Sequence, residues 1–165
     1  MSTGGTQPTS GQAETELTRL GMSLPEVPAP AGTYVPALIS GSYVHTSGQL
    51  PFVDGALPAT GKVGEGEGLV SPALAQELAA TAALNALAAI KGRIGDLDRI
   101  TRVVKVVGFI SSDPSFTGQP GVLNGASNLL GEILGEAGVH ARSAVGVAVL
   151  PMDSPVEVEL VVEFA

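Results

Sequence analysis

The carboxy-terminal segment 156–164 (VEVELVVEF) constrains the fold more than any other part of this chain. Its residues alternate with a period of two, so in a strand every second side chain points to the same face. Such a strand belongs in a sheet whose apolar face is covered by helices. The apolar face comprises Val156, Val158, Leu160, Val162 and Phe164, and the other comprises Glu157, Glu159, Val161 and Glu163.

The rest of the chain supplies further strands and two helices. Ser71 and Pro72 mark the start of an alanine-rich helix that Gly92 would end, and β-branched runs mark strands. The order β-β-α-β-α-β-β predicts an α+β sandwich, with two helices on one face of a mostly antiparallel sheet. The expected elements are strands 34–40 and 43–49, a helix 72–91, a strand 100–110, a helix 122–136, and strands 142–150 and 156–164.

The segments outside these elements have a different character. Residues 1–12 have almost no apolar side chains and are predicted to form a disordered tail. Residues 13–33 are expected to form a short helix and a proline-rich connector, which leaves 34–165 as the main domain. The segment 50–70 is a long glycine-containing loop, and loops of this length are often functional or mobile.

Charge and composition exclude several classes of function. The chain has 8 basic and 16 acidic residues, a formal net charge of −8, which disfavours nucleic-acid binding because phosphate contacts need lysine and arginine. It has no cysteine, which excludes disulfides, thiolate catalysis and cysteine-ligated metals. The amino terminus lacks the features of a signal peptide, and the apolar run 78–90 is shorter than the roughly 20 residues of a membrane span. We therefore expect a cytoplasmic protein with no membrane or nucleic-acid partner.

Four polar or flexible positions are candidates for binding or chemistry, each with a structural alternative. Arg142 opens an apolar strand, where it either holds a substrate carboxylate or forms a salt bridge to a glutamate. Glu157 lies either on a solvated face or in a partly buried position from which it activates water. Ser47 and Gly48 end a strand, where the glycine either admits a ligand or simply ends the strand.

Other patterns favour structural roles. Gly64, Gly66 and Gly68 alternate with glutamates but lack the lysine of a phosphate-binding loop. His45 and His140 lie far apart in the sequence and match no metal-ligand spacing. We therefore expect no metal site.

The penultimate strand has a face of small residues, which predicts close packing of a helix or of a neighbouring subunit. With few large side chains in the chain, oligomerisation is a reasonable way to complete the core. The last two strands are expected to form a hairpin through 151–155. The sequence leaves open whether Arg142 and Glu157 face the same side of it or meet across subunits. The small face comprises Ala144, Gly146 and Ala148, beside Arg142.

Short motifs along the chain resemble the RidA (YjgF) family of enamine/imine deaminases. They extend from about Tyr34 to the end, and the carboxy-terminal block follows the family without a gap. The amino-terminal helix and the longer first loop resemble a RidA-like branch. The motifs are Gly32-Thr-Tyr34, Thr46-Ser47-Gly48-Gln49-Leu-Pro51, Asn124 after Phe116, Ala141-Arg142-Ser143, Leu150-Pro151 and Val156-Glu157-Val158-Glu159.

The resemblance implies a chorismate-mutase-like fold and a homotrimer with a site at each subunit interface. It implies that Arg142 grips the substrate carboxylate and that Glu157 positions or activates water. Ala144 departs from the cysteine of many members, so a backbone contact to the ligand survives there but side-chain reactivity does not. No metal or organic cofactor is implied. The residues expected to line the pocket are Tyr34, Ser47, Gly48, Asn124 and Ala144.

The implied reaction is hydrolysis of a 2-enamine or 2-imine acid to a 2-oxo acid and ammonia. Two other functions stay open. The arginine pocket could retain a 2-oxo acid or another small carboxylate without turnover. Endoribonuclease or translation-inhibitor activity, names often attached to this family, is disfavoured by the net charge of −8 and the 4% aromatic content.

Overall fold

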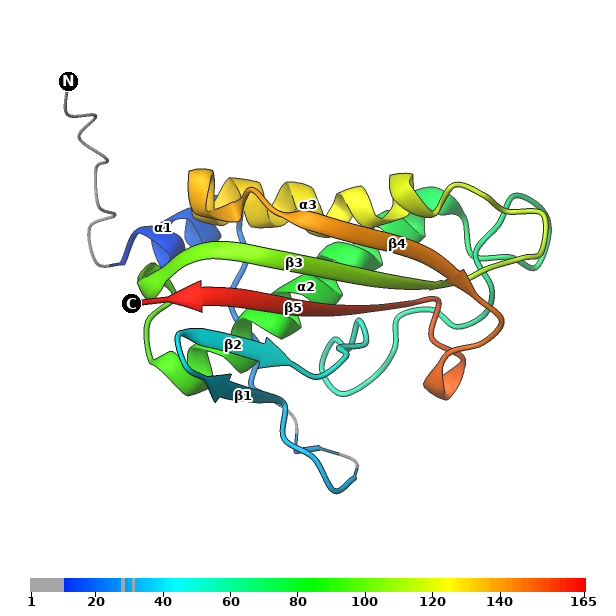
Figure 1. The fold of residues 1–165 in the computed structure, drawn as a ribbon. Coiled ribbons are helices and arrows are strands. Elements are labelled where there is room, and N and C mark those ends of the chain that lie inside the picture. The colour runs from blue at the N-terminus through cyan, green and yellow to red at the C-terminus, as the bar shows by residue number, and fades with distance from the viewer. Residues whose placement is uncertain (1–10, 28, 31) are drawn as a thin grey trace.

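Two long helices cover one face of a five-stranded sheet in the computed structural model, which describes residues 11–27, 29–30 and 32–165 (Figure 1). Three short 3-10 turns, η1 to η3, connect these elements. The helices are α1 (Gln12–Arg19), α2 (Pro72–Ile94) and α3 (Gln119–Leu134), and the turns are η1 (Leu97–Arg99), η2 (Gly135–Gly138) and η3 (Pro151–Asp153). The strands are β1 (Ala37–Ser40), β2 (Tyr43–Thr46), β3 (Ile100–Ser111), β4 (Ala141–Val147) and β5 (Val156–Phe164).

The strands lie in the order β1-β2-β5-β3-β4. β3 and β4 run parallel, whereas the other neighbouring pairs are antiparallel. The predicted α+β sandwich and its element order are therefore confirmed. The hairpin expected between the last two strands is wrong, because β3 lies between β4 and β5. The β3–α3–β4 connection is a crossover that sets β4 parallel to β3 at the sheet edge, which leaves β5 to pair with the other side of β3.

The core lies between the sheet and α2. Val158, Leu160 and Val162 of β5 are buried on the helix side, as the alternation predicts, and the residues between them are half-buried on the other face. α2 meets the core with alanines such as Ala82 and Ala86, which are fully buried. Small side chains let the backbone of a helix lie close to a sheet, so the core forms with few aromatic residues.

α2 begins as predicted but ends later. The Ser71 hydroxyl accepts a hydrogen bond from a first-turn backbone N–H at 3.2 Å, which is the expected cap. The predicted end at Gly92 is wrong, because the helix continues to the buried Ile94. Gly95 ends it with φ at +84° and donates its N–H to the carbonyl of Lys91. Glycine adopts this left-handed conformation without the Cβ clash of other residues.

α3 begins at Gln119, three residues before the predicted start at 122. Gly125, which weakens an isolated helix, has a packing role here. A Cβ atom at this position would lie 1.9 Å from the backbone carbonyl oxygen of Gln76 in α2. Glycine therefore permits the two helices to cross at a distance that any other residue would prevent.

α1 is attached to the main domain through the turn η1. The backbone N–H groups of Gln12 and Ala13 donate to the Asp98 carboxylate at 2.8 and 2.9 Å. A carboxylate at a helix amino terminus satisfies unpaired donors and interacts favourably with the helix dipole. The predicted disordered tail 1–12 extends too far, because Gln12 is the first residue of α1. Residues 1–10 lie outside the described residues.

Three strands are shorter than predicted. β1 begins at Ala37 instead of 34, because Pro36 cannot donate a ladder hydrogen bond. β2 ends at Thr46, although Gln49 forms an isolated bridge with Val158. β4 ends at Val147 instead of 150.

The loop 50–70 is held to the rest of the fold at several points. Val63 is fully buried and bridges both Val70 and Ser112. The Asn85 side chain of α2 donates to two backbone carbonyls at the start of the loop, at 2.9 and 3.1 Å. These contacts give the loop a defined path over the end of the sheet.

One described helix, α2, is long and apolar enough to cross a membrane by length and composition alone. In this fold 56% of its most apolar window is buried. The helix covers the sheet and contacts α3, so its apolar surface is used within the domain. This is the behaviour of a core helix.

Candidate functional site

Arg142 points to the helix side of the sheet. It pairs with Val106, which is fully buried beneath the helices. Its guanidinium extends to α3, where Nη1 donates to the Ser127 hydroxyl at 3.1 Å and Nη2 donates to the Pro120 carbonyl at 3.0 Å. Two protein acceptors on one planar group fix its orientation.

These bonds bear on the two alternatives for Arg142. The ion pairs found in the described part of the chain are Glu16–Arg19 and Glu14–Lys91, and neither includes Arg142. The internal salt bridge considered as its structural role is therefore not formed. A guanidinium carries more N–H donors than the two used here, so Arg142 retains donors for a ligand.

Asn124 and Ala144 flank this arginine. Pro120, Asn124 and Ser127 are spaced by four and three residues along α3, so they lie on one face of the helix. Because Pro120 and Ser127 both bind Arg142, Asn124 lies on the face next to the guanidinium, and it is exposed. Ala144 follows Arg142 on the same side of β4 and is half-buried. We call Asn124, Arg142 and Ala144 the arginine half-site.

Glu157 lies at the other side of the sheet, against Gly48. It pairs with Phe109, and its carboxyl is half-buried. Burial, together with the neighbouring Glu159 carboxylate, raises the pKa of Glu157. A Cβ atom at position 48 would lie only 1.8 Å from Oε1 of Glu157. Glycine at 48 is therefore what allows the carboxylate to occupy this place.

The backbone around Gly48 is fixed on both sides. Gln49 and Val158 exchange two backbone hydrogen bonds, at 2.8 and 3.0 Å. The Ser47 hydroxyl donates to the Val35 carbonyl at 2.7 Å, so this side chain holds the segment that carries Tyr34. Tyr34 itself is 52% exposed, which leaves it available to a partner or ligand. We call Tyr34, Ser47, Gly48 and Glu157 the glutamate half-site.

The two half-sites face opposite sides of the sheet. Arg142 is in register with Val106, and Val106 with Leu160, which is buried on the helix side. Glu157 is three residues before Leu160 on β5, and an odd separation along a strand places side chains on opposite faces. Within one chain Arg142 and Glu157 therefore point to opposite sides of the sheet, so the same-side arrangement that the sequence leaves open is not formed.

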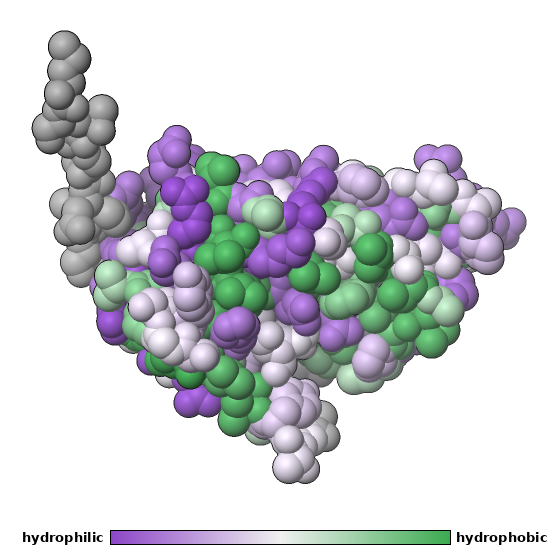
Figure 2. Space-filling model, viewed as in Figure 1, coloured by the Kyte–Doolittle hydropathy of each residue, from purple (hydrophilic) through white to green (hydrophobic). Residues whose placement is uncertain are grey.

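The sheet face turned away from the helices is open and partly apolar. Phe109, Val145 and Val161 share it with Glu157, and Val145 is 44% exposed. Lys105 lies on the same face. Figure 2, in which the sheet lies in front of the helices, shows apolar patches separated by hydrophilic residues. We call these five residues the open sheet face.

The small-residue side of β4 is contacted at Gly146 by the first residue of α3. A Cβ atom at Gly146 would lie 2.8 Å from Nε2 of Gln119 and 3.1 Å from the Ser112 hydroxyl. The start of α3 therefore contacts this side of the strand, while Gly146 and Ala148 stay exposed.

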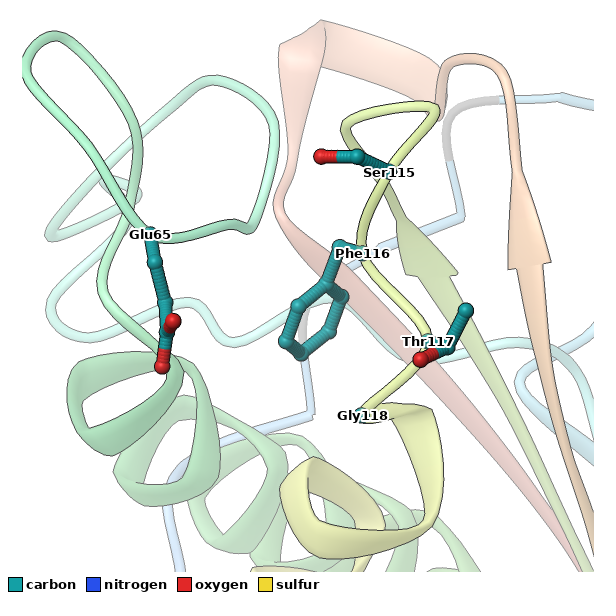
Figure 3. Close-up of a pocket in the computed structure, with 5 residues that line it drawn as sticks. All are labelled: Glu65, Ser115, Phe116, Thr117 and Gly118. Atoms are coloured by element: carbon teal, nitrogen blue, oxygen red, sulfur yellow. The ribbon is translucent and has the colours of Figure 1, made fainter.

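Two surface pockets lie beside Phe116. The larger, of about 370 Å³, is lined by Glu65, Ser115, Phe116, Thr117 and Gly118. Figure 3 shows the Phe116 ring between Glu65 on the 50–70 loop and the start of α3. The other, of about 300 Å³, is also lined by Phe116 and includes Gln119 and Gly146. Neither pocket is lined by a residue predicted for the site.

The sequence prediction does not include Ser127, which binds Arg142 directly. Its spacing of three residues from Asn124 on a helical pattern is the signal that could have found it. Among the described residues, no group of three or more His, Asp or Glu side chains is arranged to hold a metal ion.

Comparisons with known proteins agree with this fold. Residues 14–164 match the family model described as "YjgF/chorismate mutase-like, putative endoribonuclease". The chain is 44% identical to Protein TCP17 of Trypanosoma cruzi over 155 residues, which are 93% of this chain and 95% of that protein.

Solved structures give the same result. The crystal structure of Atu1372 from Agrobacterium tumefaciens, a protein of unknown function, is 44% identical with a TM-score of 0.84, and the match covers 94% of this chain and 93% of that one. The structure of E. coli TdcF with bound serine is 25% identical with a TM-score of 0.60, covering 85% and 94%. The chain belongs to the YjgF/RidA family, with its chorismate mutase-like fold.

Proposed function

We propose that this protein hydrolyses reactive 2-enamine and 2-imine acids to 2-oxo acids and ammonia, at sites formed between neighbouring subunits of a homotrimer. The observation that carries the proposal is the placement of Arg142 and Glu157 on opposite faces of one sheet. Each residue lies in a group suited to half of the reaction. A second copy of the chain supplies the missing half when its glutamate half-site meets the arginine half-site of the first.

The oligomer has support independent of the two residues. Proteins of this family typically form trimers. The open sheet face, with Phe109, Val145 and Val161, offers apolar surface that a neighbouring subunit would bury. A closed assembly of identical chains repeats the same contact at each interface, so every interface would carry one site. The family is typically cytoplasmic, and we place the activity there.

In the proposed complex Arg142 binds the substrate carboxylate. Two parallel N–H groups of a guanidinium match the geometry of a carboxylate. The protein acceptors on Nη1 and Nη2 hold the group before the substrate arrives, which fixes the direction of the adjacent C2 carbon. TdcF, a relative with a solved structure, holds a bound serine, and serine also carries a carboxylate next to a nitrogen-bearing carbon.

Glu157 of the neighbouring subunit activates the water. The raised pKa makes its carboxylate a stronger base than an ordinary glutamate. Water attacks C2 of the protonated imine while Glu157 takes a proton from it, which forms a tetrahedral aminoalcohol. Glu157 then returns the proton to the nitrogen. The C–N bond breaks as the Glu157 carboxylate takes the hydroxyl proton, which leaves a 2-oxo acid and ammonia, and the ammonia takes this proton as it departs. General-base catalysis of this kind contributes on the order of 10²–10⁴-fold.

Binding without turnover and ribonuclease activity are the competing functions. Arg142 would hold a 2-oxo acid whether or not Glu157 acts on water, so carboxylate binding alone does not separate the first from deamination. A net charge of −8 disfavours the second, because RNA binding needs several cationic contacts to phosphates.

The test uses 2-iminobutanoate, generated in solution by an amino-acid oxidase from 2-aminobutanoate. The release of 2-oxobutanoate is followed with and without protein, against the spontaneous rate. We expect acceleration by the wild type and by Asn128→Ala, a control at an exposed position of α3. Arg142→Ala should lose the acceleration. Wild-type protein that binds 2-oxobutanoate without raising the rate would replace the deaminase proposal with the binding function.

A further inference from the structure

A continuous chain of hydrogen bonds leads from His140 to the Arg142 guanidinium. Nδ1 of His140 lies 2.6 Å from the carbonyl oxygen of Gly138, and Nε2 lies 2.9 Å from the Ser127 hydroxyl. The same hydroxyl lies 3.1 Å from Nη1 of Arg142. Both His140 and Ser127 are half-buried, so water competes with these bonds less than on an open surface.

For a neutral His140 ring, the partners determine the direction of each bond. A carbonyl oxygen only accepts, so Nδ1 of His140 carries the proton and donates to Gly138. In the neutral ring Nε2 is then an acceptor, and the Ser127 hydroxyl donates its proton to it. The lone pairs of the Ser127 oxygen are left for the N–H of Arg142, which can only donate. The histidine therefore orients the serine, and the serine orients the arginine.

We propose that His140 and Ser127 are positioning residues that hold the Arg142 guanidinium in the plane required to bind the substrate carboxylate. The proposal rests on the proposed function of Arg142. Pro120 anchors Nη2, but one anchor leaves the guanidinium free to turn about that contact. The second anchor at Nη1 removes this freedom, so a ligand meets a preformed pair of donors. Ordering the guanidinium in advance lowers the entropic cost of binding.

The alternative is that this chain of bonds only ties α3 to β4. The two roles differ in what they affect. Hydrogen bonds that only link α3 to β4 affect the free energy of unfolding, and each bond adds its own contribution to that free energy. A positioning device affects the KM of the substrate and the Kd of a 2-oxo acid, and His140 acts only through the Ser127 hydroxyl.

Variants at both positions separate these roles. Ser127→Ala and His140→Phe should each raise the KM for 2-iminobutanoate and the Kd for 2-oxobutanoate by about tenfold, the effect of a weakened charge-assisted hydrogen bond. Ser127→Thr keeps the hydroxyl and His140→Gln keeps an acceptor near Nε2, so both should stay within about threefold of the wild type. The matched control on α3 is Asn128→Ala, which should behave as the wild type.

The double variant Ser127→Ala/His140→Phe gives the sharpest result. If His140 acts through Ser127, the double variant binds 2-oxobutanoate as Ser127→Ala does, because the histidine has nothing left to orient. Additive losses of about tenfold each would overturn the proposal. Unchanged Kd values, with only the unfolding free energy lowered, would overturn it as well.

A third measurement does not depend on turnover or on a ligand. Nitrogen-15 NMR of the wild type should show that the neutral form of the His140 ring carries its proton on Nδ1, and Ser127→Ala should shift the Nε2 signal. A proton on Nε2 would overturn the proposed direction of the bonds. If the wild type binds 2-oxobutanoate but hydrolyses no imine, the deaminase proposal fails while the Kd and NMR results still decide the positioning roles.

Discussion

Substituting Gly48 by alanine tests the glutamate half-site without touching a polar group. The added Cβ atom would lie 1.8 Å from Oε1 of Glu157 and 2.7 Å from its Cδ. Ordinary contact begins at 3.4 Å, so the carboxylate must move by about 1.6 Å, the difference between the two distances. Because a displacement of about 1 Å can cost on the order of 10²-fold in rate, we expect kcat to fall about 100-fold, or about 2.7 kcal/mol in the barrier.

The same change should have little effect on folding and on ligand binding. Gly48 does not have a positive φ, so alanine fits the backbone, and the carboxylate it displaces is the end of a flexible, half-buried side chain. Loss of glycine in the unfolded chain stabilises by roughly 0.4–1 kcal/mol, which offsets part of the clash. The Kd for 2-oxobutanoate should stay near the wild-type value, because Arg142 lies in the other half-site.

The assay compares imine hydrolysis above the spontaneous rate for the wild type, Gly48→Ala and a matched control, Gly92→Ala. Gly92 lies in α2 with open space around its Cα, so the control should keep full activity. A Gly48→Ala protein that hydrolyses the imine within threefold of the wild-type rate, in an intact trimer, would contradict the role of Glu157 beside Gly48.

The remaining predictions concern charge geometry, pH and helix packing. Arg142→Lys keeps the positive charge but loses the two parallel N–H groups of the guanidinium. Light scattering should show an unchanged trimer, while the hydrolysis rate falls on the order of 10²-fold. Equal rates would contradict the role of Arg142 in binding the substrate carboxylate. Because the base must be ionised, activity should fall as pH decreases through the raised pKa of Glu157, and that limb of the pH–rate profile should be absent in Glu157→Gln. When the pKa of a carboxyl is raised in the folded state, the unfolding free energy of the protein falls as pH rises through that pKa. Denaturant titrations should therefore show Glu157→Gln more stable than the wild type at neutral pH and not at acid pH. Gly125→Ala places a Cβ 1.9 Å from the Gln76 carbonyl oxygen and should lower the unfolding free energy by about 1–3 kcal/mol. Gly131→Ala on the same helix has open space around it and should stabilise the protein by up to about 1 kcal/mol. Thermal melts in which both variants behave alike would contradict the close crossing of α2 and α3.

Local patterns predicted the elements well where one signal dominates. The strand 156–164 has the predicted bounds, because its period-two alternation is complete within the segment itself. The start of α2 follows from Ser71 and Pro72 for the same reason. The end of α2 was misplaced, because Gly92 and Gly95 both suit a helix end in sequence. Burial of Ile94 by distant parts of the chain decides between them.

Relations between distant residues were beyond sequence patterns. Nothing local indicates that β3 separates β4 from β5, since the insertion depends on the crossover through α3. The opposite orientation of Arg142 and Glu157 follows from that strand order and from the register along β3. The contact of Gly48 with Glu157 joins positions more than a hundred residues apart. The family motifs name these residues, but the structure alone assigns them to two faces.

The central claim is that each site takes Arg142 from one subunit and Glu157 from the next. Mixed trimers test it most directly. Arg142→Ala and Glu157→Ala proteins are each prepared alone, and equal amounts are then unfolded together and reassembled. A site is intact when two neighbouring subunits complement each other. The Glu157→Ala subunit then supplies Arg142, and the Arg142→Ala subunit supplies Glu157. Random assembly of equivalent subunits makes about one interface in four intact.

Each variant alone should have no activity above the spontaneous rate, including after the same unfolding and reassembly. The mixture should recover about a quarter of the activity of wild-type protein treated in the same way. If Arg142 and Glu157 of one subunit served the same site, no combination of these two chains would contain an intact site. A reassembled mixed trimer with no activity above the spontaneous rate would therefore contradict the shared site.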